Sequence, residues 1–161
     1  MQLTEKLEGN LGEITVLASR YYNDNSRPYV VYSESELALE KIGDNLVIDP
    51  FFGLFFKENP FVQAEREYPI ELIYLRNKTV TTTLTLPEGY SADLPAEPIR
   101  VSNDLLDMNI DFLLDNNTLK ITGSYLLKKV VYPPRDYSRL KGLFDYMVLK
   151  FNKELILKPL E

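Results

Sequence analysis

The sequence has 161 residues, of which 45% are hydrophobic and 26% are charged, a balance typical of a soluble globular protein. A chain of this length can bury a sizeable core, so we expect a single domain over 1–161. The net charge of −6 argues against nucleic acids and anionic membranes as partners. Because the sequence has no His and no Cys, it lacks the residues of a Ser-His triad, of a Cys nucleophile with a His base, and of Cys/His zinc sites.

Short strand patterns dominate the first fifty residues. Two candidate strands cover 12–19 and 29–34, and a polar loop over 23–28 separates them. Apolar and polar residues then alternate on both sides of a Gly-Asp-Asn turn at 43–45. Alternation around a turn of this composition predicts a β-hairpin over 36–49.

The most hydrophobic stretch, residues 50–56, contains Phe51, Phe52, Phe55 and Phe56. In a strand, the first and third of these Phe residues would share one face, and the other two the opposite face. The simplest interpretation is a buried strand or loop that closes one end of a sandwich. A sandwich buries only one face of each sheet, so one pair needs a further cover, either the C-terminal helix or a partner. We therefore treat the four Phe residues as a candidate docking patch with at least one member substantially exposed; a ligand-stacking platform is a third interpretation.

The stretch 69–86 contains two strand patterns joined by a polar connection at 76–78. The first run, 70–75, places Ile70, Leu72 and Tyr74 on one face and Glu71, Ile73 and Leu75 on the other. The second, 79–86, alternates more cleanly between Thr and apolar residues. Alternation with a period of two is typical of a half-buried strand. We predict that the two runs form a hairpin and that the Pro-Glu-Gly sequence after residue 86 turns the chain.

A short strand over 98–103 precedes the clearest hairpin pattern, which covers 106–127 and turns at 115–117. The acidic residues from Asp107 to Asp111 match the start of an EF-hand calcium loop, but Phe112 occupies the sixth position, where that loop needs Gly. Their alternation with apolar residues instead predicts the solvated face of a strand. We expect no metal site there.

The strongest helix pattern covers about 136–152, where apolar residues recur every three or four positions. Asp136 is placed to cap this helix, and Gly142 within it suggests close contact with a sheet. A final strand is expected over 154–158. Many strands, regular turns and one late helix predict a mainly all-β fold: an antiparallel β-sandwich with one C-terminal α-helix packed on it.

Several short motifs follow one another in a characteristic order. They are Asn59-Pro60-Phe61, Arg66, Tyr68-Pro69-Ile70, Leu86-Pro87-Glu88-Gly89-Tyr90, Leu94-Pro95, the helix residues Tyr137, Leu140 and Phe144, and the closing Glu154-Leu155-Ile156-Leu157-Lys158. With these motifs the chain resembles, over 46–160, the C-terminal domain of unknown function of three-part bacterial proteins. A β-rich domain and a transglutaminase-like domain precede it in those proteins. The motifs are structural, so the resemblance bears on fold and context rather than on activity.

The resemblance implies a non-catalytic accessory or interaction domain. Its partner would be the transglutaminase-like domain of the same parent chain, and its location the periplasm or the cell envelope. Self-association into a homo-oligomer is a further expectation. Without Cys and His, this chain cannot perform the reaction of a transglutaminase-like enzyme. We expect no catalytic residue, no cofactor and no metal.

The alternative function is a carbohydrate- or peptide-binding module that targets the parent protein. An aromatic row on a solvent-facing sheet would favour carbohydrate binding, whereas an apolar patch without a groove would favour docking. The sequence contains no signal peptide and no apolar run of the ~20 residues that span a membrane. Any targeting segment of the parent protein is expected to lie outside this sequence.

Overall fold

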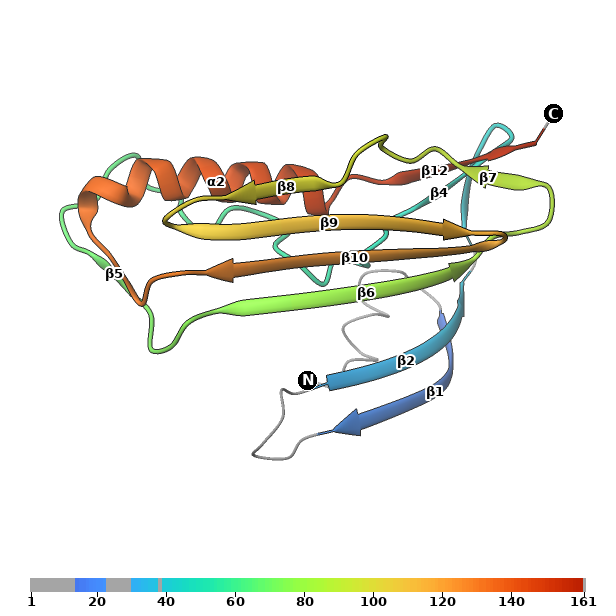
Figure 1. Ribbon diagram of the computed structural model, residues 1–161, viewed down its shortest axis with the longest axis horizontal. Coiled ribbons are helices and arrows are strands. Elements are labelled where there is room, and N and C mark those ends of the chain that lie inside the picture. Colours follow the sequence, from blue (N-terminus) through green and yellow to red (C-terminus); the bar gives the residue numbers. More distant parts are fainter. Residues whose placement is uncertain (1–13, 23–29, 38, 161) are drawn as a thin grey trace. The chain divides into compact units, whose positions relative to one another are not determined.

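The computed structural model describes residues 14–22, 30–37 and 39–160, and Figure 1 shows the arrangement of its strands and helix. The loop predicted over 23–28 lies outside these residues. No helix in the described part of the chain is long and apolar enough to span a membrane.

Contacts divide the chain into two compact units, Met1–Glu40 and Lys41–Glu161, where the sequence analysis expected one domain. The first unit contains the antiparallel pair β1 (Ile14–Tyr22) and β2 (Val30–Leu37), with a register shift between Val16 and Ala18. Among the described strands, these two hydrogen-bond only to each other. This self-contained pairing is the reason why the chain divides at residue 40.

The second unit is built on a four-stranded antiparallel sheet with the order β6-β10-β9-β8 (Figure 1). Its strands are β6 (Asn77–Thr85), β8 (Ile99–Ser102), β9 (Leu106–Asp115) and β10 (Thr118–Leu127). The predicted hairpin over 106–127 is confirmed as β9 and β10, joined by a two-residue Asn-Asn turn in which Asn116 has a positive φ of 51°. Asn tolerates this conformation well, which suits it to tight hairpin turns.

One face of this sheet forms the larger part of the core. The buried side chains alternate along β9 and β10, as the sequence pattern predicts, and they are Leu106, Met108, Ile110, Leu119, Ile121, Tyr125 and Leu127. On β6 the Thr residues at 79, 81, 83 and 85 point to solvent. The alternation of apolar and polar residues therefore sets which face of each strand is buried.

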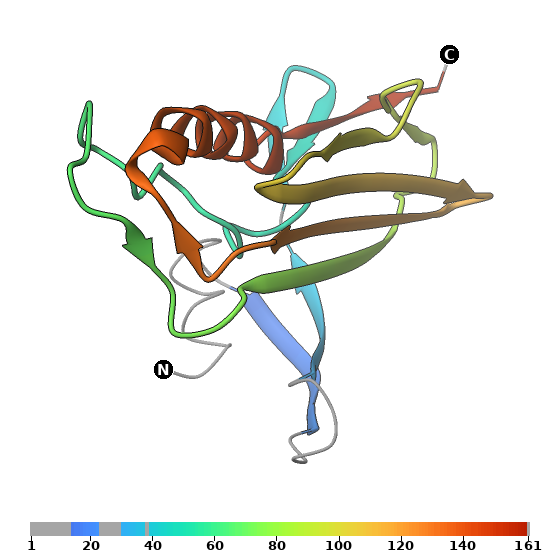
Figure 2. The ribbon, with the colours of Figure 1, turned by 60° about the vertical axis from the view of Figure 1, so that its left-hand side comes forward.

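A second four-stranded sheet has the order β3-β4-β12-β7. Its strands are β3 (Glu40–Ile42), β4 (Asn45–Ile48), β7 (Tyr90–Ala92) and β12 (Leu155–Pro159). β12 continues directly from the helix, so the helix and this sheet line the same side of the larger sheet (Figures 1 and 2). The short turn between β3 and β4 contains Gly43 at a positive φ of 62°, in agreement with the predicted turn at 43–45.

The hairpin predicted over 69–86 is wrong. Only β5 (Ile70–Glu71) forms from the first run, and it pairs with β11 (Val131–Tyr132), whereas β6 pairs with β10. The physical reason is burial: β6 joins the large apolar core through β10, while residues 73–75 lie exposed and have no core to pack on.

The predicted helix is confirmed as α2 (Tyr137–Phe151), preceded by a 3₁₀ turn at Pro134–Asp136. Its buried stripe consists of Tyr137, Leu140, Phe144, Met147 and Phe151. The expected side-chain cap from Asp136 is wrong, because this residue already has a helical backbone and its side chain makes no capping hydrogen bond. Gly142 is exposed, and no atom lies within 4 Å of the position that the methyl group of an Ala would occupy there, so the expected close contact with a sheet is also wrong.

The fold class is therefore mainly antiparallel β, and α2 is the single α-helix of the described residues. The helix packs on the β-sheet core through its buried stripe, as the sequence predicts. The side chains between helix and sheet come from the Phe-rich stretch over 50–56.

Candidate functional site

The Phe-rich stretch forms a tight turn instead of a strand. The carboxylate of Asp49 accepts hydrogen bonds from the backbone N–H groups of Phe51, at 2.9 Å, and Gly53, at 2.7 Å. Phe52 and Gly53 both have positive φ, 53° and 62°. A non-glycine residue in this conformation is uncommon and needs support from its surroundings, and the Asp49 carboxylate supplies it. The turn directs the flanking Phe side chains towards the core.

Phe51 and Phe55 are core residues. Their exposed fractions are 1% and 8%, and their rings pack edge to face with centroids 5.0 Å apart. Phe55 stacks on Phe151 of α2 at 3.8 Å, with the ring planes nearly parallel at 8°. These two members of the candidate docking patch are therefore unavailable to a partner, and their assignment to that patch is wrong.

Phe52 and Phe56 are half-buried rather than exposed. The ring of Phe56 lies 5.1 Å from that of Phe144 and 5.4 Å from that of Tyr125. Helix α2 thus covers Phe56 from within the chain, which is one of the two possibilities raised by the sequence. Phe51, Phe55 and Phe56 form a bridge between sheet and helix, the Phe bridge, and the four Phe residues do not form one exposed surface.

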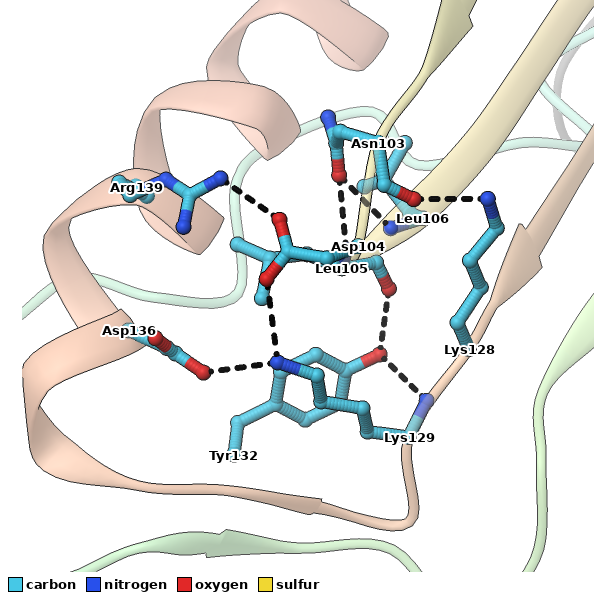
Figure 3. Close-up of polar contacts among 9 residues, drawn as sticks. All are labelled: Asn103, Asp104, Leu105, Leu106, Lys128, Lys129, Tyr132, Asp136 and Arg139. Carbon is cyan, nitrogen blue, oxygen red and sulfur yellow. Dashed lines mark hydrogen bonds and ion pairs between the residues drawn. The ribbon is translucent and has the colours of Figure 1, made fainter.

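A network of charged side chains joins three segments beside α2 (Figure 3). Asp104, between β8 and β9, accepts hydrogen bonds from Arg139 of α2 at 2.8 Å and from Lys129 at 3.3 Å. Lys129 follows β10 and also donates to Asp136 at 3.0 Å. Acidic and basic groups alternate through the network, so each charge faces an opposite one.

The electrostatics of this network favour a structural role. The hydrogen bond from Arg139 lowers the pKa of Asp104, and the same bond raises the pKa of Arg139. The hydrogen bond to Asp136 raises the pKa of Lys129. All three shifts move the groups further from pH 7, whereas a general acid or base needs a pKa near the working pH. The network therefore holds fixed charges rather than exchangeable protons.

Hydrogen bonds between side chains and the backbone hold the same region (Figure 3). The hydroxyl of Tyr132 donates to the carbonyl oxygen of Leu105 at 2.9 Å and accepts from the backbone N–H of Lys129 at 3.2 Å. Asn103 accepts from the N–H groups of Leu105 and Leu106 at 2.8 and 3.1 Å. Because Leu105 is fully buried, these bonds satisfy backbone groups that water cannot reach. They fix the turn between β8 and β9.

The acidic face of β9 is likewise occupied by ion pairs. Asp107 contacts Lys128 at 2.6 Å and accepts a hydrogen bond from Ser102 at 2.6 Å, while Asp111 pairs with Arg100 at 2.9 Å. The hydrogen bond from Lys128 lowers the pKa of Asp107. In the described part of the chain, no three His, Cys, Asp or Glu residues are grouped closely enough to hold a metal ion.

A shallow hollow lies beside the first turn of α2. Its volume is about 180 Å³, below the roughly 300–1,000 Å³ of typical ligand pockets. It is lined by Ala64, Glu65, Arg66, Pro134, Tyr137 and Ser138. The guanidinium carbon of Arg66 lies 5.9 Å from the centre of the Tyr137 ring, and the Tyr137 hydroxyl donates to the carbonyl oxygen of Gln63 at 2.8 Å. Both of these polar side chains are thus engaged with the protein itself.

The outward face of the larger sheet is mainly polar, with the exposed Leu113 of β9 as an exception. On β6 and β10 it carries Thr79, Thr81, Thr83, Thr85, Lys120, Thr122 and Ser124, and on β9 it carries Asp107, Asn109 and Asp111. The described strands place no row of aromatic side chains on this face. The observation that would have favoured a carbohydrate platform is therefore missing.

An exposed apolar patch lies instead where β5 meets β11. We define this β5–β11 patch by Ile73, Tyr74, Leu75, Val130 and Val131, which are 97%, 64%, 51%, 43% and 47% exposed. A backbone hydrogen bond of 2.7 Å from Leu72 to Val130 and the β5–β11 pairing hold the two segments together. Exposed apolar side chains on neighbouring segments are typical of interaction surfaces in soluble proteins.

The sequence did not predict this patch, because the pattern over 70–75 resembles a strand. One signal in the sequence indicated it: apart from Glu71, the run carries apolar residues on both faces, whereas the other strands alternate apolar and polar residues. A two-faced apolar strand is stable only when both faces are covered. This chain covers Ile70 and leaves Ile73 almost fully exposed.

The fold recurs in a solved structure. A chain from Parabacteroides distasonis ATCC 8503, whose crystal structure is described as that of a "putative protease", matches with a TM-score of 0.58 and 18% sequence identity. The match covers 70% of this chain and 23% of that chain, so the present chain corresponds to less than a quarter of the matched protein. A search of curated proteins found no match.

A family model matches residues 44–157 of the chain. This range contains the larger sheet, α2, the Phe bridge and the β5–β11 patch. The family is described as a domain of unknown function with a solved structure, and the match extends over more than half of the sequence. The chain belongs to the DUF3858 family.

Proposed function

We propose that the chain is a non-catalytic accessory domain that docks on a neighbouring domain through the β5–β11 patch. The observation that carries this proposal is the exposure of Ile73, Tyr74 and Leu75, three consecutive apolar side chains, beside Val130 and Val131. Burying such a patch would gain about 25 cal/mol per Å² of apolar surface removed from water.

The neighbouring domain belongs to a longer parent protein. Support comes from the matched solved structure, of which this fold occupies only 23%. By the resemblance to three-part bacterial proteins, the neighbour would be a transglutaminase-like domain, and the location would be the envelope or the periplasm. Domain interfaces within one chain commonly bury roughly 600–1,500 Å² in total, and a patch of five apolar residues is suited to the centre of such an interface.

Composition and charge support the non-catalytic part of this proposal. The sequence contains no His or Cys, the most common bases and nucleophiles at neutral pH. The acidic side chains with shifted pKa values, such as Asp104 and Asp107, are held ionised by ion pairs. Carbohydrate binding, the alternative function, lacks an aromatic platform on the described sheet face.

Binding between separately produced domains tests the docking proposal. Isothermal titration of this chain into the parent's transglutaminase-like domain should give measurable affinity, and Ile73→Asp should weaken it at least about tenfold, equivalent to ~1.4 kcal/mol. The matched control is Val62→Asp, because Val62 is also exposed, at 84%, but lies outside the patch. Equal affinity of both variants, or no binding by the wild type, would refute docking through this patch.

A further inference from the structure

The second interaction feature is the free edge of the larger sheet. β6 is the terminal strand in the order β6-β10-β9-β8, and it pairs with β10 over its whole length, from Asn77 to Thr85. Figure 1 shows it at the margin of this sheet. On its other side, no strand of the described residues hydrogen-bonds to it. Among the described strands, the outer backbone N–H and C=O groups of β6 therefore have no strand partner.

β8, at the opposite edge of the sheet, differs from β6 in length, in charge and in the proline beside it. β8 has only four residues, it carries Arg100, and Pro98 immediately precedes it. Short length, charge and proline are the devices by which proteins block pairing between edge strands. The β8 edge of the larger sheet is thus protected against pairing with a further strand.

β6 lacks these protections. It has nine residues without Pro or Gly, and its register with β10 runs without a bulge. Its one charged residue is Lys78, whose ammonium donates a hydrogen bond to the carbonyl oxygen of Leu54. That charge is directed to the Phe-rich turn, so it does not guard the edge. Val80 and Leu84, on the inward face of β6, stay half-buried.

We propose that the β6 edge binds β6 of a second copy of this chain, antiparallel and centred on Thr81, so that the two larger sheets form one continuous sheet. In this register Thr81 faces its own symmetry mate, and Thr79 faces Thr83 of the second copy. Cross-strand Thr–Thr pairs are favourable. On the inward face, Val80 lies opposite Thr82.

Charge also fits this arrangement. The two Lys78 residues lie six positions apart along the paired strands, about 20 Å at roughly 3.3 Å per residue, so no like charges face each other. Thr and apolar residues otherwise occupy most of the strand, although each copy has a net charge of −6. A two-fold interface must be self-complementary, and a neutral Thr-rich strand meets this condition better than an alternating charged strand.

Sedimentation equilibrium of the purified chain tests the proposal. The wild type should show a concentration-dependent dimer across the micromolar range. Thr81→Lys places like charges directly opposite each other and should weaken dimerisation at least about tenfold, whereas Thr122→Lys, on the adjacent inner strand and the same face, should not. An equimolar mixture of Thr81→Lys and Thr81→Glu should restore the dimer.

A cysteine variant tests the register. The chain contains no Cys, so Thr81→Cys introduces a unique thiol that should form an intermolecular disulfide with oxidised glutathione, because directly opposed Cβ atoms lie within reach. Thr122→Cys, one strand inward, should cross-link far more slowly. A wild type that stays monomeric, a dimer insensitive to Thr81→Lys, or equal cross-linking of the two Cys variants would each refute the proposed pairing.

Discussion

A Cβ atom added to Gly123 would lie 2.6 Å from Cζ of Phe51. Gly123 is in the middle of β10, and Phe51 belongs to a turn much earlier in the chain. The same hypothetical Cβ would approach Phe55 to 3.0 Å. The Phe bridge therefore packs directly against the sheet backbone, and only Gly leaves room for both rings at this point.

Gly123→Ala should destabilise the domain. Overpacking a well-packed core typically costs about 1–3 kcal/mol, because neighbouring rings must leave their preferred positions. Urea denaturation should show a lower midpoint with an unchanged slope. Adding Phe51→Leu should recover part of the loss, since the smaller side chain vacates the space. A midpoint equal to that of the wild type would mean that the Phe bridge is loosely packed.

Gly142→Ala should have the opposite effect. Gly142 lies within α2, is exposed, and would have no atom within 4 Å of an added Cβ. Ala is favoured over Gly within helices by about 1 kcal/mol. Thermal melts of this variant should therefore show a higher melting temperature than the wild type. A decrease would indicate that this face of the helix contacts something in solution, such as a second copy.

Much of the fold could be predicted from local patterns in the sequence. Alternation correctly identified the buried faces of β6, β9 and β10, and the three- and four-residue spacing correctly identified α2. These patterns are local because they reflect which side of each element leaves water. The partner of each strand was harder to predict. The run over 79–86 was assigned to a hairpin with its neighbour in sequence, but β6 pairs with β10, which lies much later in the chain.

The conformation of the Phe-rich stretch also depends on contacts between residues that are far apart in the sequence. The burial of Phe51 and Phe55 results from the Asp49 turn together with α2 and Gly123, and no local pattern contains all three. The motif at Asn59 is explained in the same way. Its side-chain amide donates to the carbonyl oxygen of Lys141 at 2.9 Å and to the carboxylate of Asp145 at 2.7 Å. The motif attaches a loop to a helix that is distant in sequence.

Phe144→Ala should cause one of the largest losses of stability in the chain. Phe144 is 2% exposed, and its ring contacts Phe56 and Phe61, with centroids 5.1 and 4.8 Å away. Truncating a buried Phe to Ala typically costs about 3–5 kcal/mol. Leu149→Ala is the matched control, since Leu149 is 65% exposed on the same helix and should change stability by no more than about 0.5 kcal/mol. Similar losses for the two variants would contradict the packing of α2.

The ion-pair network around Asp104 should make stability depend on pH at both extremes. The pKa of Asp104 is lowered in the folded protein, so its contribution is present above the unfolded value of about 3.9 and is lost as pH falls through the folded pKa. The pKa of Lys129 is raised, so its contribution is present below the unfolded value of about 10.4 and is lost as pH rises through the folded pKa.

Asp104→Asn should therefore lower the melting temperature between about pH 5 and pH 9, where all partners are charged, and its difference from the wild type should narrow below about pH 4. Because Asp104 and Arg139 are more than half exposed, the effect should be modest and should shrink in high salt. Glu88→Gln, which neutralises an exposed carboxylate in the turn before β7, is the control for the loss of one surface charge. A difference between Asp104→Asn and the wild type that stays constant down to about pH 2 would contradict a contribution from the charge of Asp104.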